Sequence, residues 1–105
     1  MVKSKGKESY VAIADAVYLK AEGNFTTIMK SDGTTALHHL PLGKIMEDPP
    51  QDFVRVHRSY AVNRAYIAAL RSAPGSKYWL EMKDADDVPV SRYRVAELRA
   101  LLTRQ

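Results

Sequence analysis

The chain has 105 residues and no cysteine, which suits one domain and excludes a disulfide framework, a cysteine-ligated zinc site and a cysteine nucleophile. Hydrophobic residues make up 46% of the chain, so a packed globule is expected rather than a disordered segment. The net charge is +4, and all 8 arginines lie after residue 52, together with 2 lysines and 5 acidic residues. This basic half is typical of a domain that binds an anionic partner. The alternative is that the arginines form an ordinary solvated surface.

The polar N-terminus differs in composition from the rest of the chain. Residues 1–9 contain three lysines and no apolar run, so we expect a flexible lead-in or linker remnant rather than a secretory signal. The domain itself is expected over residues 10–105. The longest apolar runs are only a few residues long, which is too short for a membrane span.

The first half of the domain is expected to form a meander of antiparallel strands. In the segment Ala16–Ala21, apolar residues alternate with Tyr18 and Lys20, as in a strand with one buried face. The pair Asp32-Gly33 is a strong hairpin signal, because glycine accepts the positive φ of primed turns. The extended segments predicted in this half are Tyr10–Ile13, Ala16–Ala21, Phe25–Met29 and Thr34–His39.

The second half is expected to combine further strands with two helices. Leu42–Met46 can form a short helix that begins after Pro41 and ends before Pro49. Helical spacing of apolar residues predicts a C-terminal helix over Ser91–Leu102, with Ser91 as the N-cap. The predicted strands are Phe53–Ile67, with a break described below, Tyr66–Arg71, Lys77–Met82 and Val88–Val90. The predicted fold is all-β, with small antiparallel sheets packed together.

The segment Phe53–Ile67 has the strongest functional pattern, because it contains several cationic residues and no acidic residue. Strict alternation along a strand would bury Arg58 among apolar side chains, and an unpaired buried arginine is very costly. We therefore expect a break or bulge at His57-Arg58-Ser59 that exposes His57 and Arg58 at a tip. The alternative is that Arg58 forms a salt bridge and that His57 is merely packed.

A second candidate site lies at the start of the predicted C-terminal helix. Arg92 and Arg94 oppose the helix dipole there, whereas a phosphate would satisfy both the free amides and the two arginines. The alternative is an ordinary capped helix with solvated arginines. A third candidate is the turn with Asn24, followed by Thr26 and Thr27, which are residue types that contact base edges. The alternative there is a polar hairpin turn.

Four segments, in the same order, resemble the LytTR DNA-binding domain of bacterial transcription regulators. Together they extend over roughly Ala14–Leu102, and the most specific is the stretch FVRVHRSYAVNRAYI at Phe53–Ile67. The other three are Asp15–Phe25, Leu40–Met46, and Val90–Arg94 with the leucine-bearing segment after it.

The resemblance implies the output domain of a regulator that reads double-stranded DNA with loops in successive major grooves. It also implies two copies on direct repeats, a monomer alone and a dimer on DNA, a fused or separate receiver or sensory domain, and a cytoplasmic location. No cofactor or metal is implied. The residues expected to bind DNA are Asn24, Thr26, Thr27, His57, Arg58, Ser59, Ser91, Arg92, Tyr93 and Arg94.

Two other classes of function are compatible with parts of the sequence. The six tyrosines and one tryptophan between Tyr10 and Tyr93 could stack on bases in an RNA- or single-strand-binding β module, but most lie at positions typical of a core. His57 and Ser59 are two residues apart, yet nothing resembles a nucleophile elbow or an oxyanion loop, so no catalytic residue is expected. His38 and His39 would point to opposite faces of a strand and do not predict a metal site.

Overall fold

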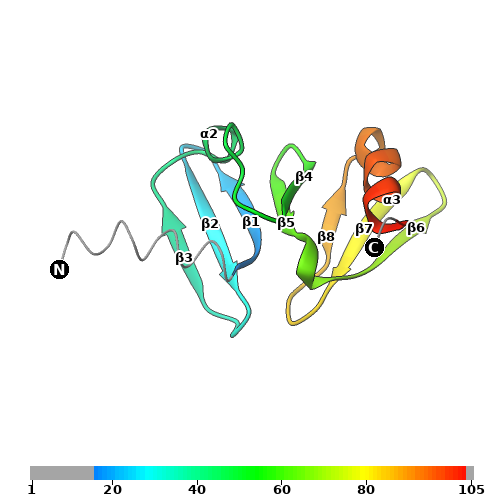
Figure 1. The fold of residues 1–105 in the computed structure, drawn as a ribbon, viewed down its shortest axis with the longest axis horizontal. Helices are drawn as coiled ribbons and strands as arrows, with labels where there is room; N and C mark the ends of the chain where they lie inside the picture. The colour runs from blue at the N-terminus through cyan, green and yellow to red at the C-terminus, as the bar shows by residue number, and fades with distance from the viewer. Residues whose placement is uncertain (1–15, 104–105) are drawn as a thin grey trace.

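A computed structural model of the protein describes residues 16–103 and has two antiparallel β-sheets with two short α-helices (Figure 1). The first sheet has the strand order β3-β2-β1-β5-β4 and the second the order β6-β7-β8. The strands are β1 (Ala16–Glu22), β2 (Phe25–Lys30), β3 (Thr35–His38), β4 (Phe53–His57), β5 (Tyr60–Asn63), β6 (Ile67–Ala73), β7 (Lys77–Met82) and β8 (Val88–Val90). The helical segments are α2 (Leu42–Ile45), η1 (Arg64–Tyr66), η2 (Arg92–Arg94) and α3 (Val95–Thr103).

The predicted all-β fold with a mid-chain helix and a C-terminal helix is confirmed. The expected lead-in at residues 1–9 and the extended segment at residues 10–13 lie outside the described residues. The domain bounds 10–105 therefore stay a prediction.

The two N-terminal hairpins form where the turn residues predict them. Gly23 between β1 and β2 has a φ of 73°, and Gly33 between β2 and β3 has a φ of 88°. Residues other than glycine rarely adopt this backbone conformation. The carboxylate of Asp32 accepts hydrogen bonds from the backbone N–H (2.9 Å) and the hydroxyl (2.6 Å) of Thr34, which fixes the second turn. The part of the predicted meander that lies within the described residues, β1 to β3, is confirmed.

Strand β1 lies at the centre of the large sheet and is buried on both faces. It pairs with β2 on one side and β5 on the other. Tyr18 is only 7% exposed and packs with Val17 in the core between the sheets, whereas Leu19 packs in a second cluster. The prediction that this strand has only one buried face was therefore wrong, because other elements cover both sides of it.

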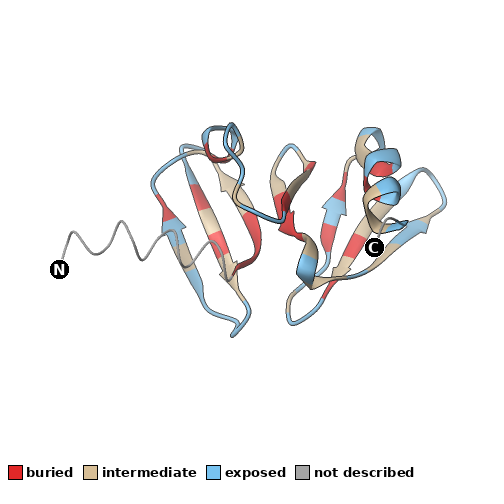
Figure 2. Ribbon diagram, viewed as in Figure 1, coloured by how far each residue is buried: buried red, intermediate tan, exposed pale blue. Residues whose placement is uncertain are grey.

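The main core fills the space between the two sheets. Figure 2 shows buried residues on strands of both sheets and on one side of α3, with exposed residues at the hairpin ends. This cluster contains Val17, Tyr18, Val56, Val62, Leu80, Met82, Val88, Val90, Val95 and Leu98. Because it draws on both sheets and on α3, the core fixes the position of the small sheet relative to the large one.

A second apolar cluster lies on the opposite face of the large sheet. The short helix α2 buries Leu42 and Ile45 there, against residues of β1 and β2 that include Leu19 and Ile28. The buried side chain of Asn63 closes the end of this sheet by donating from its amide to the carbonyl of Ala16 (3.0 Å). A buried amide with its hydrogen bonds made contributes to one defined register.

The C-terminal helix starts differently from the prediction. The side chain of Ser91 caps it as expected and accepts a hydrogen bond from the backbone N–H of Tyr93 (3.2 Å). The first turn, Arg92–Arg94, is however a 3₁₀ turn, and the α-helix begins only at Val95. Arg92 and Arg94 therefore lie in a tight turn ahead of the helix, which moves them off the α-helix proper.

Candidate nucleic-acid interface

Three segments that are far apart in the sequence meet at one end of the molecule. They are the β1–β2 turn, the β4–β5 turn and the junction between β8 and η2. The backbone N–H of Ala21 donates to the carbonyl of Ser59 (2.8 Å), and the backbone N–H of Ser91 donates to the carbonyl of Val56 (2.8 Å). These bonds join main chain to main chain, so they hold the three segments together along the upper edge of Figure 1.

The β4–β5 turn has the break that the sequence predicts. Strand β4 ends at His57, and β5 begins at Tyr60, so Arg58 and Ser59 form a two-residue turn. Arg58 is exposed, and no acidic side chain among residues 16–103 pairs with it, so the salt-bridge alternative is wrong within the described chain. The predicted break and the exposure of Arg58 at the tip are confirmed, whereas His57 is only partly exposed.

The ring of His57 is built into this turn. Its Nδ1 accepts a hydrogen bond from the backbone N–H of Ser59 (3.0 Å), so the neutral ring carries its proton on Nε2. The ring also packs edge-on against Tyr60, with a centroid distance of 5.9 Å. Burial lowers the pKa of His57 below its usual value, and the neighbouring Arg58 and Arg55 lower it further. His57 is therefore a neutral donor at neutral pH.

The free energy of unfolding is expected to fall as the pH drops from 7.5 to 5. The pKa of His57 lies below 6.5 in the fold, so the unfolded chain takes up the proton first and is stabilised as the pH falls. The pKa of His38 is lowered in the same way, by burial and by His39. In the variant His57→Asn, a side-chain oxygen can still accept the Ser59 N–H but cannot titrate, so urea unfolding should show a smaller loss. An equal loss in this variant would contradict the assignment.

The β8–η2 junction presents an arginine and an exposed aromatic ring as one unit. The guanidinium of Arg92 lies over the ring of Tyr93, 5.1 Å from its centroid, and donates to the phenol oxygen (3.1 Å). Tyr93 is 79% exposed, which is unusual for a large aromatic side chain. Arg94 lies 3.8 Å from Glu97 across the first turn of α3, a solvent-exposed contact that contributes little stability.

The third group of candidate residues, at the β1–β2 turn, differ from one another in their exposure. Asn24 is exposed, and Thr27 is partly buried with its hydroxyl 3.3 Å from the carboxylate of Glu22. Thr26 is fully buried and donates to the carbonyl of Leu40 (2.9 Å). Thr26 therefore has no surface with which to contact DNA in this structure, because the pleat of β2 turns it toward α2, and we leave it out of the proposed contacts.

Arg55 is a residue of the tip that the sequence prediction did not include. Its Nε–H donates to the carbonyl of His57 (3.0 Å), and its Nη2–H donates to the carbonyl of Arg58 (2.6 Å). Burial lowers the pKa of Arg55, and the nearby Arg94 lowers it further. Both arginines line an open groove of about 380 Å³ between β4 and α3. The alternation in FVRVH predicts that Arg55 is a cation on the strand, but it does not predict the hydrogen bonds that Arg55 makes.

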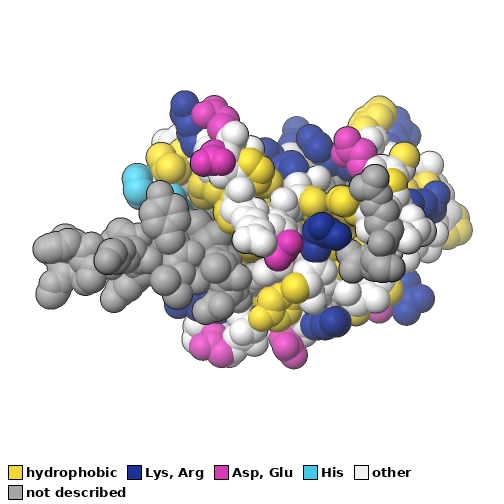
Figure 3. All heavy atoms as spheres, viewed as in Figure 1, with side chains coloured by type: hydrophobic (Ala, Val, Ile, Leu, Met, Phe, Trp, Pro, Cys, Tyr) yellow, Lys and Arg dark blue, Asp and Glu magenta, His cyan; other side chains and the backbone are white. Residues whose placement is uncertain are grey.

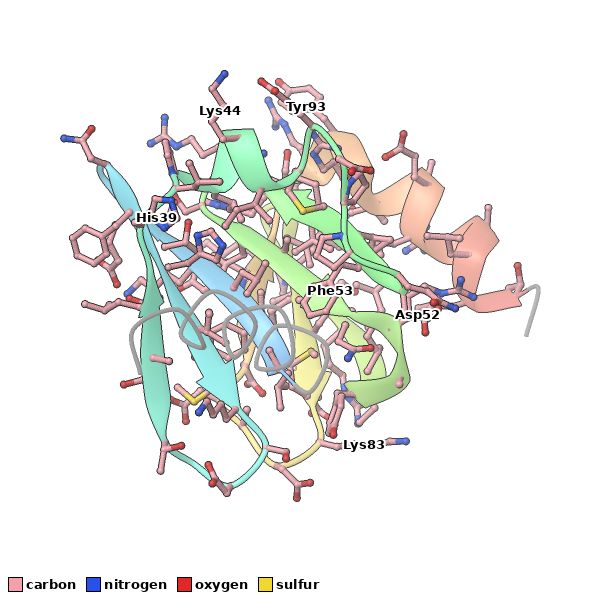
Figure 4. All side chains as sticks on the ribbon, turned by 60° about the vertical axis from the view of Figure 1, so that its left-hand side comes forward. His39, Lys44, Asp52, Phe53, Lys83 and Tyr93 are labelled. Carbon is pink, nitrogen blue, oxygen red and sulfur yellow. The ribbon has the colours of Figure 1, made fainter. Side chains whose placement is uncertain are left out.

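The edge formed by the three segments is basic. Lys and Arg side chains lie along the upper edge of Figure 3, over α2, the β4–β5 turn and the start of α3, with acidic side chains between them. Lys44 and Tyr93 project from this same edge in Figure 4, and Lys83 projects from the opposite one.

Among residues 16–103, no group of three or more His, Asp or Glu side chains could hold a metal ion, and no helix could span a membrane.

A rigid β scaffold that gathers basic turns at one edge is typical of nucleic-acid-binding domains. Comparison with known proteins identifies which kind: the model of the LytTr DNA-binding domain family matches residues 7–103. The chain belongs to this family. The fold is also similar to the solved LytTr DNA-binding domain of a response regulator from Bacillus cereus, with a TM-score of 0.71 and 30% identity over 86% of this chain and 83% of that one.

Several curated bacterial regulators are similar in sequence. The sensory transduction protein LytT of Bacillus subtilis is 48% identical over 51% of this chain and 22% of its own length. The CO-responsive transcriptional regulator RcoM of Rhodospirillum rubrum is 34% identical over 89% of this chain and 40% of its own length. The chain thus spans less than half the length of these relatives. The family is a class of DNA-binding domains and not a class of enzymes.

Proposed function

We propose that this domain binds double-stranded DNA in a sequence-specific way and regulates transcription, with the three segments of this edge facing the major groove. The observation that carries the proposal is the pair of backbone hydrogen bonds that holds the turns at one edge, from the N–H of Ala21 to the carbonyl of Ser59 and from the N–H of Ser91 to the carbonyl of Val56. The major groove of B-DNA is about 12 Å wide and admits a two-stranded ribbon, so the β4–β5 hairpin has a suitable shape.

The side chains at this edge divide into base-reading and phosphate-binding groups. Arg58 is exposed at the tip and has the planar fork that pairs with guanine, and His57 offers its Nε2–H beside it. Arg92 and Asn24 are further base-reading candidates. The remaining proposed contacts, which go mainly to phosphates and sugars, are Thr27, Ser59, Ser91, Tyr93 and Arg94.

The assembly on DNA is part of the same proposal. One domain presents a small edge, so a single half-site should bind weakly, and two copies on direct repeats would gain from effective concentration. The domain is then a monomer alone and a dimer on DNA. The names of LytT and RcoM describe longer sensory and regulatory proteins, which fits an output domain working in the cytoplasm with a receiver or sensory domain.

Selection from random duplex DNA tests the proposal. We expect enrichment of a repeated motif whose affinity falls with salt, because each neutralised phosphate contributes about −0.9 to the slope of log K against log salt concentration. Gel-shift titrations of the enriched duplex at two salt concentrations would measure both the affinity and this slope. Binding without any enriched motif would contradict sequence-specific reading, and no duplex binding would overturn the proposal.

One observation favours a second candidate, a domain that binds RNA or single-stranded DNA. Tyr93 is 79% exposed and Phe25 is 39% exposed, so two aromatic rings are available for base stacking. A competition between the enriched duplex and its separate strands distinguishes the two functions. If the single strands compete better than the duplex, and Tyr93→Ala removes that preference, the second function replaces the first.

A further inference from the structure

The β4–β5 turn has a backbone conformation that tight hairpins do not favour. Two-residue hairpin loops prefer primed turns, in which one or both central residues have positive φ, because that twist matches the flanking strands. In the described chain, positive φ at residues other than glycine occurs only at Asp52, Ser76 and Asp84. Both central residues, Arg58 and Ser59, therefore have negative φ. This turn needs support from outside its own backbone.

A strand irregularity and three hydrogen bonds provide that support. The register of β4 shifts between Arg55 and His57, which places Val56 as an extra residue in the ladder and adjusts the local twist. His57 Nδ1 accepts the N–H of Ser59 inside the turn. Arg55 also binds the turn, with one hydrogen bond to the carbonyl of His57 and one to the carbonyl of Arg58.

The contacts of Arg55 are directed at the turn and not outward. Its two hydrogen bonds use adjacent N–H groups of one planar guanidinium, and the carbonyls that they reach belong to successive residues. Among residues 16–103, no carboxylate lies within ion-pair distance of Arg55. The turn carbonyls are therefore its main partners, and the direction of the His57 and Arg58 side chains depends on the backbone that it holds.

We propose that Arg55 is the positioning residue of the DNA-reading turn: it binds no phosphate itself and sets the geometry in which His57 and Arg58 meet the bases. The inference rests on the proposed function, since it assigns how one of the three turns is held for reading. Loss of this contact should reduce specific binding more than nonspecific binding. Nonspecific binding depends on the number of cations, whereas specific binding depends on where Arg58 is held.

Two substitutions separate positioning from simple charge. Arg55→Lys keeps the positive charge but has no planar fork to span two carbonyls, and Arg55→Gln loses the charge as well. We expect both variants to bind the enriched duplex about tenfold more weakly or worse, since hydrogen bonds from charged groups are the stronger kind. We also expect Arg55→Lys to bind random duplex within about threefold of wild type with an unchanged salt slope. The matched control is Lys83→Gln, which removes a charge from the opposite edge (Figure 4).

The opposite result would be recognisable. If Arg55→Lys binds like wild type while Arg55→Gln loses affinity and roughly one unit of salt slope, Arg55 is a phosphate contact and the inference is wrong. Arg58→Ala is measured in parallel. If Arg58→Ala leaves specific binding intact, the proposed function fails at this turn, whatever Arg55 does. If Arg58→Ala weakens specific binding and both Arg55 variants do not, only the inference fails.

Amide exchange gives a readout without DNA. In Arg55→Lys, the Ser59 amide that is bonded to His57 should exchange about tenfold faster or more, because loss of the Arg55 hydrogen bonds opens the turn locally. The amide of the buried residue Val62 should keep its wild-type rate, which shows that the variant is folded. Unchanged exchange at Ser59 in a folded variant would overturn the inference even if DNA binding is weaker.

Discussion

Arg58→Ala is expected to weaken binding of the enriched duplex by about tenfold to a hundredfold, because one good bidentate pair contributes about 1–3 kcal/mol of discrimination. Arg58 is exposed at the tip of the β4–β5 hairpin, and within residues 16–103 it has no acidic partner that would compete with DNA. Gel-shift titration of wild type and variant on the enriched duplex and on random duplex measures the effect. Random duplex should be affected much less than the enriched one.

The fold should not change in this variant. The backbone carbonyl of Arg58 accepts a hydrogen bond from Arg55, and this bond survives truncation of the Arg58 side chain. Arg58→Lys is the matched control, since it keeps the charge and loses the fork. If Arg58→Lys reads the motif as well as wild type, the side chain acts as a point charge on a phosphate, and base reading belongs to another turn.

The sequence predicts this tip for a physical reason that the structure confirms. Regular alternation through FVRVHRSY would have buried Arg58, and the cost of an unpaired buried charge favoured a break at that point. The Asp32-Gly33 hairpin is also predictable, because its turn depends on the chemistry of two adjacent residues. Features that depend on neighbouring residues in the chain are thus accessible from sequence.

Features that depend on packing between distant segments are not. Tyr18 is buried because α2 and the small sheet cover opposite faces of the large sheet, which a strand pattern does not reveal. Thr26 looks like a base-contacting residue in sequence, but its hydroxyl bonds to a carbonyl 14 residues away. The role of Arg55 follows only from the coordinates of the turn that it holds. The sequence therefore identified the three turns better than the contacts within them.

Leu80→Ala is expected to lower the free energy of unfolding by about 2–5 kcal/mol, the range for truncating a buried leucine. Leu80 is fully buried in β7, the central strand of the small sheet, and packs in the core between the sheets. A domain of this size is stable by only about 5–15 kcal/mol, so the loss is a large share of the total. Urea unfolding measures it, and the melting temperature should fall by about 8 °C or more.

Leu37→Ala is the matched control, since it makes the same chemical change in β3 at a side chain that is 66% exposed. We expect it to change the free energy of unfolding by no more than about 0.5 kcal/mol.

Comparison of Leu80→Ala with Arg58→Ala also separates stability from DNA reading. Below its melting temperature, Leu80→Ala should bind the enriched duplex in proportion to its folded fraction, because Ser91 still bonds to Val56 and the edge is intact. Arg58→Ala should show the reverse, with normal stability and weak specific binding. A folded Leu80→Ala variant that has lost specific binding would mean that the core positions the reading turns as directly as the backbone bonds do.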